Sequence, residues 1–217
     1  MRVILFGATG MVGQGVLREC LRDDRVESVL TIGRTATGRT HPKLRELVRA
    51  DMFDVGADGA DFRGYDACLF CLGVSSLGMS EAAYTHLTFD LTMAWAQAIA
   101  RTNPGMAFLY VSGAGTGGKA MWARVKGRTE TALLALLPSA YMIRLKVLRP
   151  MHGEISKARW IRIAYPMLRP LLWLVQRVAP DTVVTTEELG RAMLHVAREG
   201  APTHVLESRD LRALASA

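Results

Sequence analysis

A glycine-rich turn near the start of the chain constrains the fold more than any other feature of the sequence. Gly7, Gly10 and Gly13 form a G-x-x-G-x-x-G motif between an apolar run at 3–6 and a segment with helical spacing at 11–21. Strand, glycine turn and helix in this order bring backbone N–H groups and a helix N-terminus against a phosphate. The motif predicts a Rossmann-type dinucleotide site, and the predicted cofactor-binding residues in it are Gly7, Thr9, Gly10, Met11, Val12 and Gly13.

Strand and helix patterns alternate along most of the chain. Buried-strand runs occupy 3–6, 29–32, 44–48, 67–71, 107–111 and 141–145, and helical periodicity occupies 11–21, 81–100 and 119–137. Thr185 and Glu188 are spaced as a capping box that begins a further helix. Alternation of this kind is typical of a parallel sheet with right-handed crossover helices. We therefore expect an α/β fold, a Rossmann-type doubly wound parallel sheet with a small C-terminal helical elaboration, as one domain over 1–217.

The positive charge of the chain is concentrated in one region. Residues 141–180 hold eight Lys or Arg and one acid, which accounts for the net charge of +7. Within this region, 153–180 is predicted to be a basic-apolar insertion over a substrate cleft, and 160–178 mixes Trp and Leu with Arg. It is too charged and too broken by proline to span a bilayer. A lid, a peripheral membrane contact and a protein contact remain open, whereas no nucleic-acid module is visible.

The cysteines and histidines do not form a pattern of their own. Cys68 and Cys71 are three residues apart in a predicted strand and point to opposite faces, so we expect two unconnected buried thiols. The five histidines occur singly, and no metal site is predicted. Met1 leads directly into a strand without a signal peptide, which favours a cytoplasmic location.

The end of the second predicted strand bears on cofactor preference. It reads Thr31-Ile32-Gly33-Arg34, with no carboxylate at the place where NAD-preferring proteins bind the ribose hydroxyls. Arg34 offers a planar guanidinium for a 2′-phosphate, and Arg39 is a possible second contact. NADP is therefore the predicted cofactor, with NAD possible; the alternative is that Arg34 is a solvated loop residue.

Four segments carry a resemblance to a known family. They are residues 7–13, Cys71-Leu72-Gly73, Tyr110-Val111-Ser112-Gly113-Ala114, and Val125-Lys126-Gly127 followed by Glu130. Together they resemble the atypical short-chain dehydrogenase/reductases of the NAD(P)H-binding, NmrA-like kind, including epimerase/dehydratase-like and Tat-interacting-protein oxidoreductase-like proteins. The resemblance covers roughly residues 1–150.

The resemblance implies roles for individual residues. It places Asp51 near the adenine and Gly73 near a ribose, and it adds Met52, Cys71 and Leu72 to the cofactor contacts. Ser112 matches the serine that approaches a substrate carbonyl, and Lys126 matches the lysine that holds the nicotinamide ribose. The simpler alternatives are that Asp51 is a turn residue and Lys126 a solvated helix residue.

The chain departs from the family at Trp122. The family has Tyr-x-x-x-Lys, whereas this sequence reads Trp122-Ala123-Arg124-Val125-Lys126. An indole N–H donates hydrogen bonds but does not supply a transferable proton as a phenol does. Tyr84 is a candidate substitute donor. Two hypotheses follow: an NADP(H)-dependent oxidoreductase or epimerase-like enzyme on a small carbonyl substrate, or a catalytically impaired NADP(H) sensor or scaffold.

Overall fold

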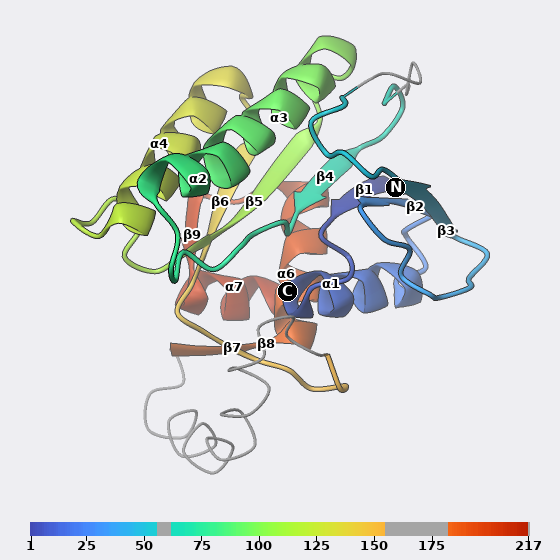
Figure 1. Ribbon diagram of the computed structural model, residues 1–217. Helices are drawn as coiled ribbons and strands as arrows, with labels where there is room; N and C mark the ends of the chain where they lie inside the picture. Colours follow the sequence, from blue (N-terminus) through green and yellow to red (C-terminus); the bar gives the residue numbers. More distant parts are fainter. Residues whose placement is uncertain (56–61, 155–181, 217) are drawn as a thin grey trace.

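A parallel sheet forms the centre of the molecule. The computed structural model describes residues 1–55, 62–154 and 182–216. The strands of the sheet are β1 (Arg2–Phe6), β2 (Ser28–Gly33), β3 (Leu44–Val48), β4 (Ala67–Phe70), β5 (Ala107–Gly113), β6 (Ala140–Leu145) and β9 (Val205–Glu207). They form one seven-stranded sheet in the order β3-β2-β1-β4-β5-β6-β9, with every neighbouring pair parallel (Figure 1). The predicted Rossmann-type α/β class is confirmed.

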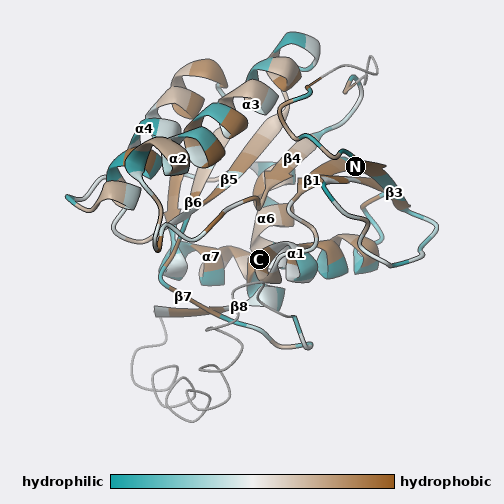
Figure 2. Cartoon of the chain, in the orientation of Figure 1, coloured by the Kyte–Doolittle hydropathy of each residue, from teal (hydrophilic) through white to brown (hydrophobic). Residues whose placement is uncertain are grey.

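Helices cover both faces of this sheet (Figure 1). On one face lie α1 (Met11–Arg22), α6 (Thr186–Glu199) and α7 (Ser208–Ala215), and on the other α3 (Leu91–Thr102) and α4 (Met121–Leu136). Successive strand side chains point to opposite faces, so Val3 and Leu5 join a core with α1 and α6, whereas Ile4 and Phe6 join a core with α3 and α4. Figure 2 accordingly shows apolar strands between the two helical layers. Burial on both faces explains why these strands read as continuous apolar runs.

The helix predicted over 81–100 is interrupted. It begins as α2 (Glu81–Thr85), where the Ser80 hydroxyl accepts from the Ala83 N–H at 3.2 Å. It continues through a π-helical turn, η1 (His86–Asp90), into α3. The helix ends at Asn103, before Pro104. A π turn adds one residue to a helical turn, and the apolar spacing did not reveal it.

A second, small sheet lies below the main one (Figure 1). It pairs β7 (Val147–Arg149) with β8 (Val183–Thr185) in parallel. The predicted capping box follows β8 and is confirmed: the Thr185 hydroxyl accepts from the Glu188 N–H at 3.0 Å, and the Glu188 carboxylate accepts from the Thr185 N–H at 2.8 Å. Strands of three residues are too short to produce a detectable period in the sequence.

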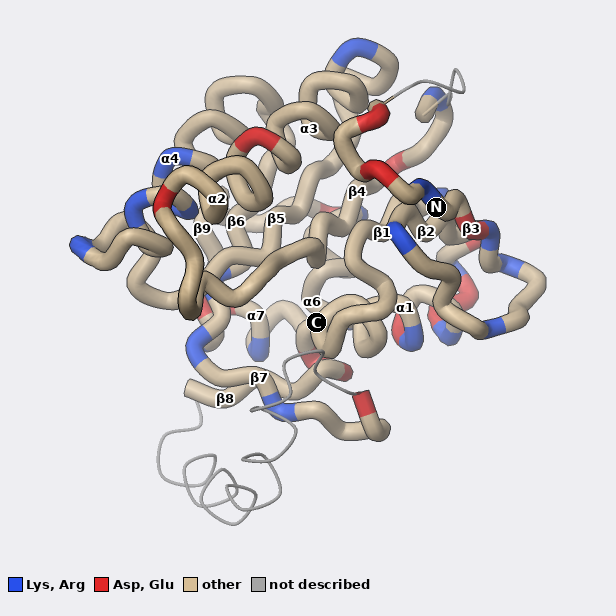
Figure 3. The backbone as a smooth tube through the Cα atoms, in the orientation of Figure 1, with Lys and Arg blue, Asp and Glu red and all other residues tan. Residues whose placement is uncertain are grey.

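The described charges lie mainly on helices and loops, while β4 and β5 carry none (Figure 3). In the basic region, Arg144 pairs with Glu130, and Lys146 lies 3.7 Å from Glu207. Apart from its first two residues, the predicted insertion 153–180 lies outside the described residues, as does all of 160–178. Among the helices that are described, none has the length and apolarity needed to cross a bilayer.

Candidate functional site

A cavity of about 650 Å³ opens at the carboxyl ends of β1, β2, β4 and β5. Ligands of open α/β sheets bind at this edge, where neighbouring crossovers leave to opposite faces. The structure brings eleven of the predicted site residues together around this cavity. They are Gly7, Thr9, Gly10, Met11, Val12, Arg34, Cys71, Leu72, Gly73, Ser112 and Lys126.

The glycine turn is shaped by close backbone approaches. Gly7 has φ 78°, and a Cβ there would lie 2.6 Å from the carbonyl oxygen of Cys71. A Cβ at Gly13 would lie 2.2 Å from the carbonyl oxygen of Gly7. Only glycine allows the first turn of α1 to approach the end of β1 this closely. Gly13 is not among the residues lining the cavity, and its place in the motif is to support the turn.

The N-terminus of α1 is left open toward the cavity. Gly10 is its N-cap and supplies no side-chain hydrogen bond, and the first turn contains no acidic residue. Thr9, Gly10, Met11 and Val12 all line the cavity. The N–H groups of a first helical turn lack partners within the helix and carry the positive end of its dipole. This end of the cavity therefore suits a phosphate.

The other end of the cavity contains a residue that the sequence analysis missed. Glu46 of β3 lines it together with the exposed Arg34. One oxygen of Glu46, Oε2, accepts from the Thr37 backbone N–H at 2.7 Å and from the Thr31 hydroxyl at 3.3 Å. The end of β2 itself carries no carboxylate, as the sequence indicated, but the neighbouring strand β3 supplies one. Thr31 and Glu46 lie opposite each other in the parallel pairing of β2 and β3. Glu46 could therefore be found from the sequence only if the alignment of these two strands were known.

Ser112, at the end of β5, is held by a neighbouring threonine. The two hydroxyl oxygens of Ser112 and Thr116 lie 2.9 Å apart, and Thr116 donates its hydroxyl to the Gly113 carbonyl at 2.7 Å. Since Thr116 has a single hydroxyl proton, Ser112 is the donor of the pair. The lone pairs of the Ser112 oxygen then remain for a ligand in the cavity.

Lys126, on α4, places an amino group at the cavity. Its Nζ donates to the Val111 carbonyl at 3.2 Å and lies 5.1 Å from the centre of the Tyr110 ring. Burial lowers the pKa of Lys126 to about 8, while Glu130, one helical turn later, acts to raise it. The Glu130 carboxylate is turned toward Arg144, which donates to both of its oxygens. Lys126 therefore exchanges a proton close to neutral pH.

Five other predicted residues do not line this cavity. The Trp122 ring packs against the end of β5 and the loop after it, where a Cβ at Gly113 would meet it at 3.6 Å and a Cβ at Gly115 at 3.7 Å. Tyr84 is buried, and burial raises the pKa of its phenol. Asp51 accepts from the Phe53 N–H at 2.8 Å in a turn, and the Met52 carbonyl accepts from the Trp95 indole at 2.8 Å. Arg39 is exposed and also lies outside the lining. Their functional roles stay predictions.

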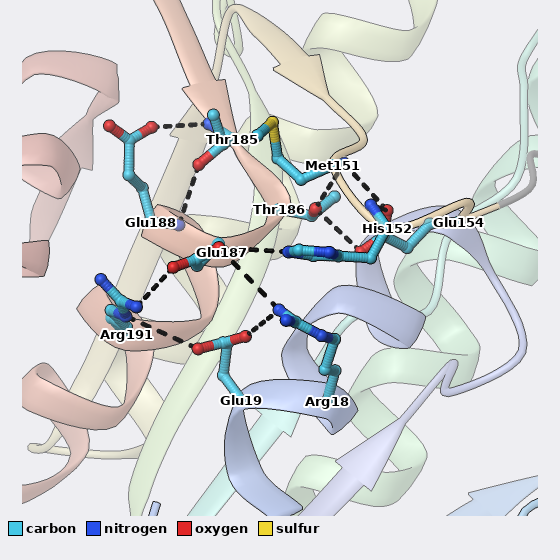
Figure 4. A network of polar contacts seen from close by, with 10 residues as sticks. All are labelled: Arg18, Glu19, Met151, His152, Glu154, Thr185, Thr186, Glu187, Glu188 and Arg191. Atoms are coloured by element: carbon cyan, nitrogen blue, oxygen red, sulfur yellow. Dashed lines mark hydrogen bonds and ion pairs between the residues drawn. The ribbon is translucent and has the colours of Figure 1, made fainter. Parts of the chain in front are cut away.

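Behind the glycine turn, α1 is fixed to α6 and to the loop after β7 by a polar network (Figure 4). Glu19 of α1 lies 2.6 Å from Arg18 and 3.6 Å from Arg191 of α6. The buried Glu154 accepts from the Thr186 hydroxyl at 2.9 Å and from two backbone N–H groups of its own loop. These contacts join α1, whose N-terminus faces the cavity, to α6, and α6 to the loop after β7.

Among known sequences, the chain resembles a curated protein over part of its length. No protein-family model matches the chain. A curated relative, the mitochondrial protein FMP52 of Chaetomium globosum, is 30% identical over 121 residues, which is 53% of this chain and 50% of that protein. The match therefore spans half the length of the relative. Because that protein is mitochondrial by name, the cytoplasmic location predicted for this chain stays a prediction.

Comparisons with solved structures are more extensive. WbmF of Bordetella bronchiseptica, solved with NAD+, has a TM-score of 0.70 and 13% identity, covering 98% of this chain and 76% of WbmF. UDP-glucuronic acid 4-epimerase of Bacillus cereus, solved with NAD, has a TM-score of 0.70 and 11% identity, covering 95% and 77%. The human epimerase family protein SDR39U1, solved with NADPH, has a TM-score of 0.63 and 15% identity, covering 97% and 77%. The predicted resemblance to epimerase/dehydratase-like and atypical short-chain dehydrogenase/reductase proteins is thereby confirmed at the level of the fold.

Proposed function

We propose that the chain binds a nicotinamide dinucleotide in this cavity, prefers NADP(H), and acts as an oxidoreductase or epimerase-like enzyme on a small carbonyl compound. One observation carries the proposal: a single cavity joins the open N-terminus of α1 to Ser112 and Lys126. Its volume of about 650 Å³ is within the usual range for small-molecule sites. The NAD+ and NADPH bound in the structural neighbours support the same assignment.

The residues present fit such a cofactor. The backbone of residues 9–12 would hold the pyrophosphate, and Arg34 would contact a 2′-phosphate by charge-assisted hydrogen bonds. At Gly73, a Cβ would meet no atom within 4 Å, so the chain leaves open space beside the cavity. A bound nicotinamide supplies the hydride chemistry. The reaction also requires a group that accepts or donates the proton that accompanies hydride transfer.

Lys126 and Ser112 are the residues proposed for that requirement. Lys126 fixes the cofactor ribose and, with a pKa of about 8, holds or releases a proton at Nζ near neutral pH. Ser112 donates its hydrogen bond to Thr116, so its oxygen accepts a hydrogen bond from the hydroxyl of the alcohol form of the substrate and orients it. The phenol of Tyr84 and the indole of Trp122 are not needed in this scheme.

The proposal is tested at Gly10. Its φ of −87° and ψ of 162° are open to any residue, and a Cβ there would meet only the Gly7 carbonyl oxygen, at 3.4 Å. In Gly10→Asp, the carboxylate caps α1 and repels a phosphate at the same place. We expect NADPH binding, measured by calorimetry, to weaken by about 100-fold or more, while thermal stability is kept. Gly10→Ala is the matched control, and retained binding in Gly10→Asp would refute the phosphate site.

A second candidate function rests on the placement of Trp122. Neither Trp122 nor Tyr84 lines the cavity, which favours a protein that binds NADP(H) without turnover, as a sensor or scaffold. The two functions separate in Trp122→Tyr, assayed by cofactor oxidation over a panel of carbonyl compounds. Activity gained from an inactive wild type supports the sensor. Activity present in the wild type and lost in Lys126→Ala supports the enzyme.

A further inference from the structure

Glu46 introduces a negative charge at the end of the cavity where the sequence predicts only a positive one. It projects from the edge strand β3 and lines the cavity with Arg34 and Thr37. The chain thus places an acid and a base at the same end. For a proposed dinucleotide site, this is the end remote from Ser112 and Lys126, beyond the phosphate turn.

The position of the Glu46 carboxylate is fixed on one side. Its Oε2 atom holds the loop after β2 through the Thr37 N–H at 2.7 Å, and the Thr31 hydroxyl adds a contact at 3.3 Å. These neutral donors orient the carboxylate without cancelling its charge. A carboxylate has about four lone-pair sites in total, so this anchoring leaves acceptor capacity for a ligand.

We propose that Glu46 is a specificity-determining residue that opposes Arg34. A carboxylate accepts hydrogen bonds from ribose hydroxyls and repels a 2′-phosphate, whereas a guanidinium favours that phosphate. The balance between the two residues sets the cofactor preference, and the cavity takes NAD(H) as well as NADP(H). This inference rests on the proposed function and deepens it.

The size of the effect follows from elementary electrostatics. A 2′-phosphate carries nearly two negative charges at pH 7. In a water-like medium, a carboxylate at about 6 Å from such a dianion weakens its binding about tenfold. Glu46 is exposed, so the water-like value is the appropriate one. Removing only the charge of Glu46 should therefore raise the preference for a 2′-phosphate about tenfold.

Glu46→Gln is the test variant, because the amide oxygen can still accept from Thr37 while the charge is lost. Calorimetry at low salt measures the affinities of AMP, adenosine 2′,5′-bisphosphate, NADH and NADPH for the wild type and the variant. The first two ligands lack nicotinamide, so this readout does not depend on turnover. Asp24→Asn is the matched control for loss of one charge, because Asp24 is exposed in the turn before β2, at the other end of that strand from the cavity.

In each ligand pair, the affinity for the ligand with a 2′-phosphate is divided by the affinity for the ligand without one. We expect Glu46→Gln to raise this ratio about tenfold for both the AMP pair and the NADH pair, and the increase to be smaller at high salt. A change below twofold, or the same change in Asp24→Asn, would overturn the inference while leaving the proposed function standing. A wild type that binds none of the four ligands would overturn both. Glu46→Ala also removes the loop anchor, and a shift seen in that variant alone would assign the effect to the loop and reject the role of the charge.

Discussion

Replacing Lys126 with methionine tests the electrostatic description of the site without requiring a known substrate. Burial lowers the pKa of Lys126 from 10.5 to about 8, which means that the fold disfavours its ammonium form by about 3 kcal/mol relative to the amine. Below pH 8 both the folded and the unfolded chains carry this proton, and the full penalty is present. As the pH rises from 8 toward 10.5, the folded chain releases the proton first and wild-type stability increases.

Methionine has a similar length and no charge, so Lys126→Met lacks the pH-dependent penalty. It also loses the hydrogen bond from Nζ to the Val111 carbonyl, which costs about 1 kcal/mol at any pH. The net expectation at pH 7 is a variant about 1 to 2 kcal/mol more stable than the wild type. At pH 10 this advantage disappears or reverses, because the wild type has regained about 2 to 3 kcal/mol.

Urea unfolding at pH 7 and pH 10 gives the free energy of unfolding of the wild type and of Lys126→Met. At each pH, the difference between the two proteins isolates the contribution of Lys126 from that of the other titrating groups. Lys119→Met is the matched control, because Lys119 is exposed on the loop before α4. Its effect should be the same at the two pH values. An equal difference at both pH values for Lys126→Met would mean that the amino group is solvated. The assignment of a near-neutral proton to Lys126 would then fail.

Two further predictions concern cofactor preference and local stability. Arg34→Asp should weaken NADPH binding by about tenfold or more and NADH binding by less than about threefold, since a phosphate contact is charge-assisted. Equal losses for the two cofactors in calorimetry would remove Arg34 from the phosphate site. Arg39→Asp is the comparison, because Arg39 lies outside the cavity lining. Thr185→Ala should lower the free energy of unfolding by about 1 kcal/mol through loss of the α6 cap, and Thr185→Ser should restore it. A urea transition unchanged in Thr185→Ala would show that the capping box adds no stability.

Sequence reasoning recovered the elements whose signal is local. The runs at 3–6 and 107–111 are continuous and apolar because both faces of the sheet are covered, and they correspond to β1 and β5. The glycine motif was informative because one of its close backbone contacts, that of Gly13 with Gly7, is made within the motif itself. By contrast, β7, β8 and β9 have three residues each and draw their stability from neighbours distant in the sequence.

The parts of the site that sequence reasoning missed depend on tertiary neighbours. Glu46 reaches the cavity only because β3 pairs in register with β2. The role of Thr116 depends on a loop that folds back to Ser112 and the Gly113 carbonyl. The lowered pKa of Lys126 comes from burial, which residue spacing does not show. Local patterns thus predicted the scaffold better than the electrostatics of the cavity.

The small β7–β8 sheet and the Glu154 contact have a consequence for the start of α6. The Glu154 carboxylate accepts from the hydroxyl of Thr186, the first residue of that helix and directly after β8. Residues 147–154 and 183–186 are therefore neighbours in space, although they are far apart in the sequence. A substitution at Glu154 should thus affect the N-terminus of α6 as well as the loop after β7, and the two sites should not be additive in stability.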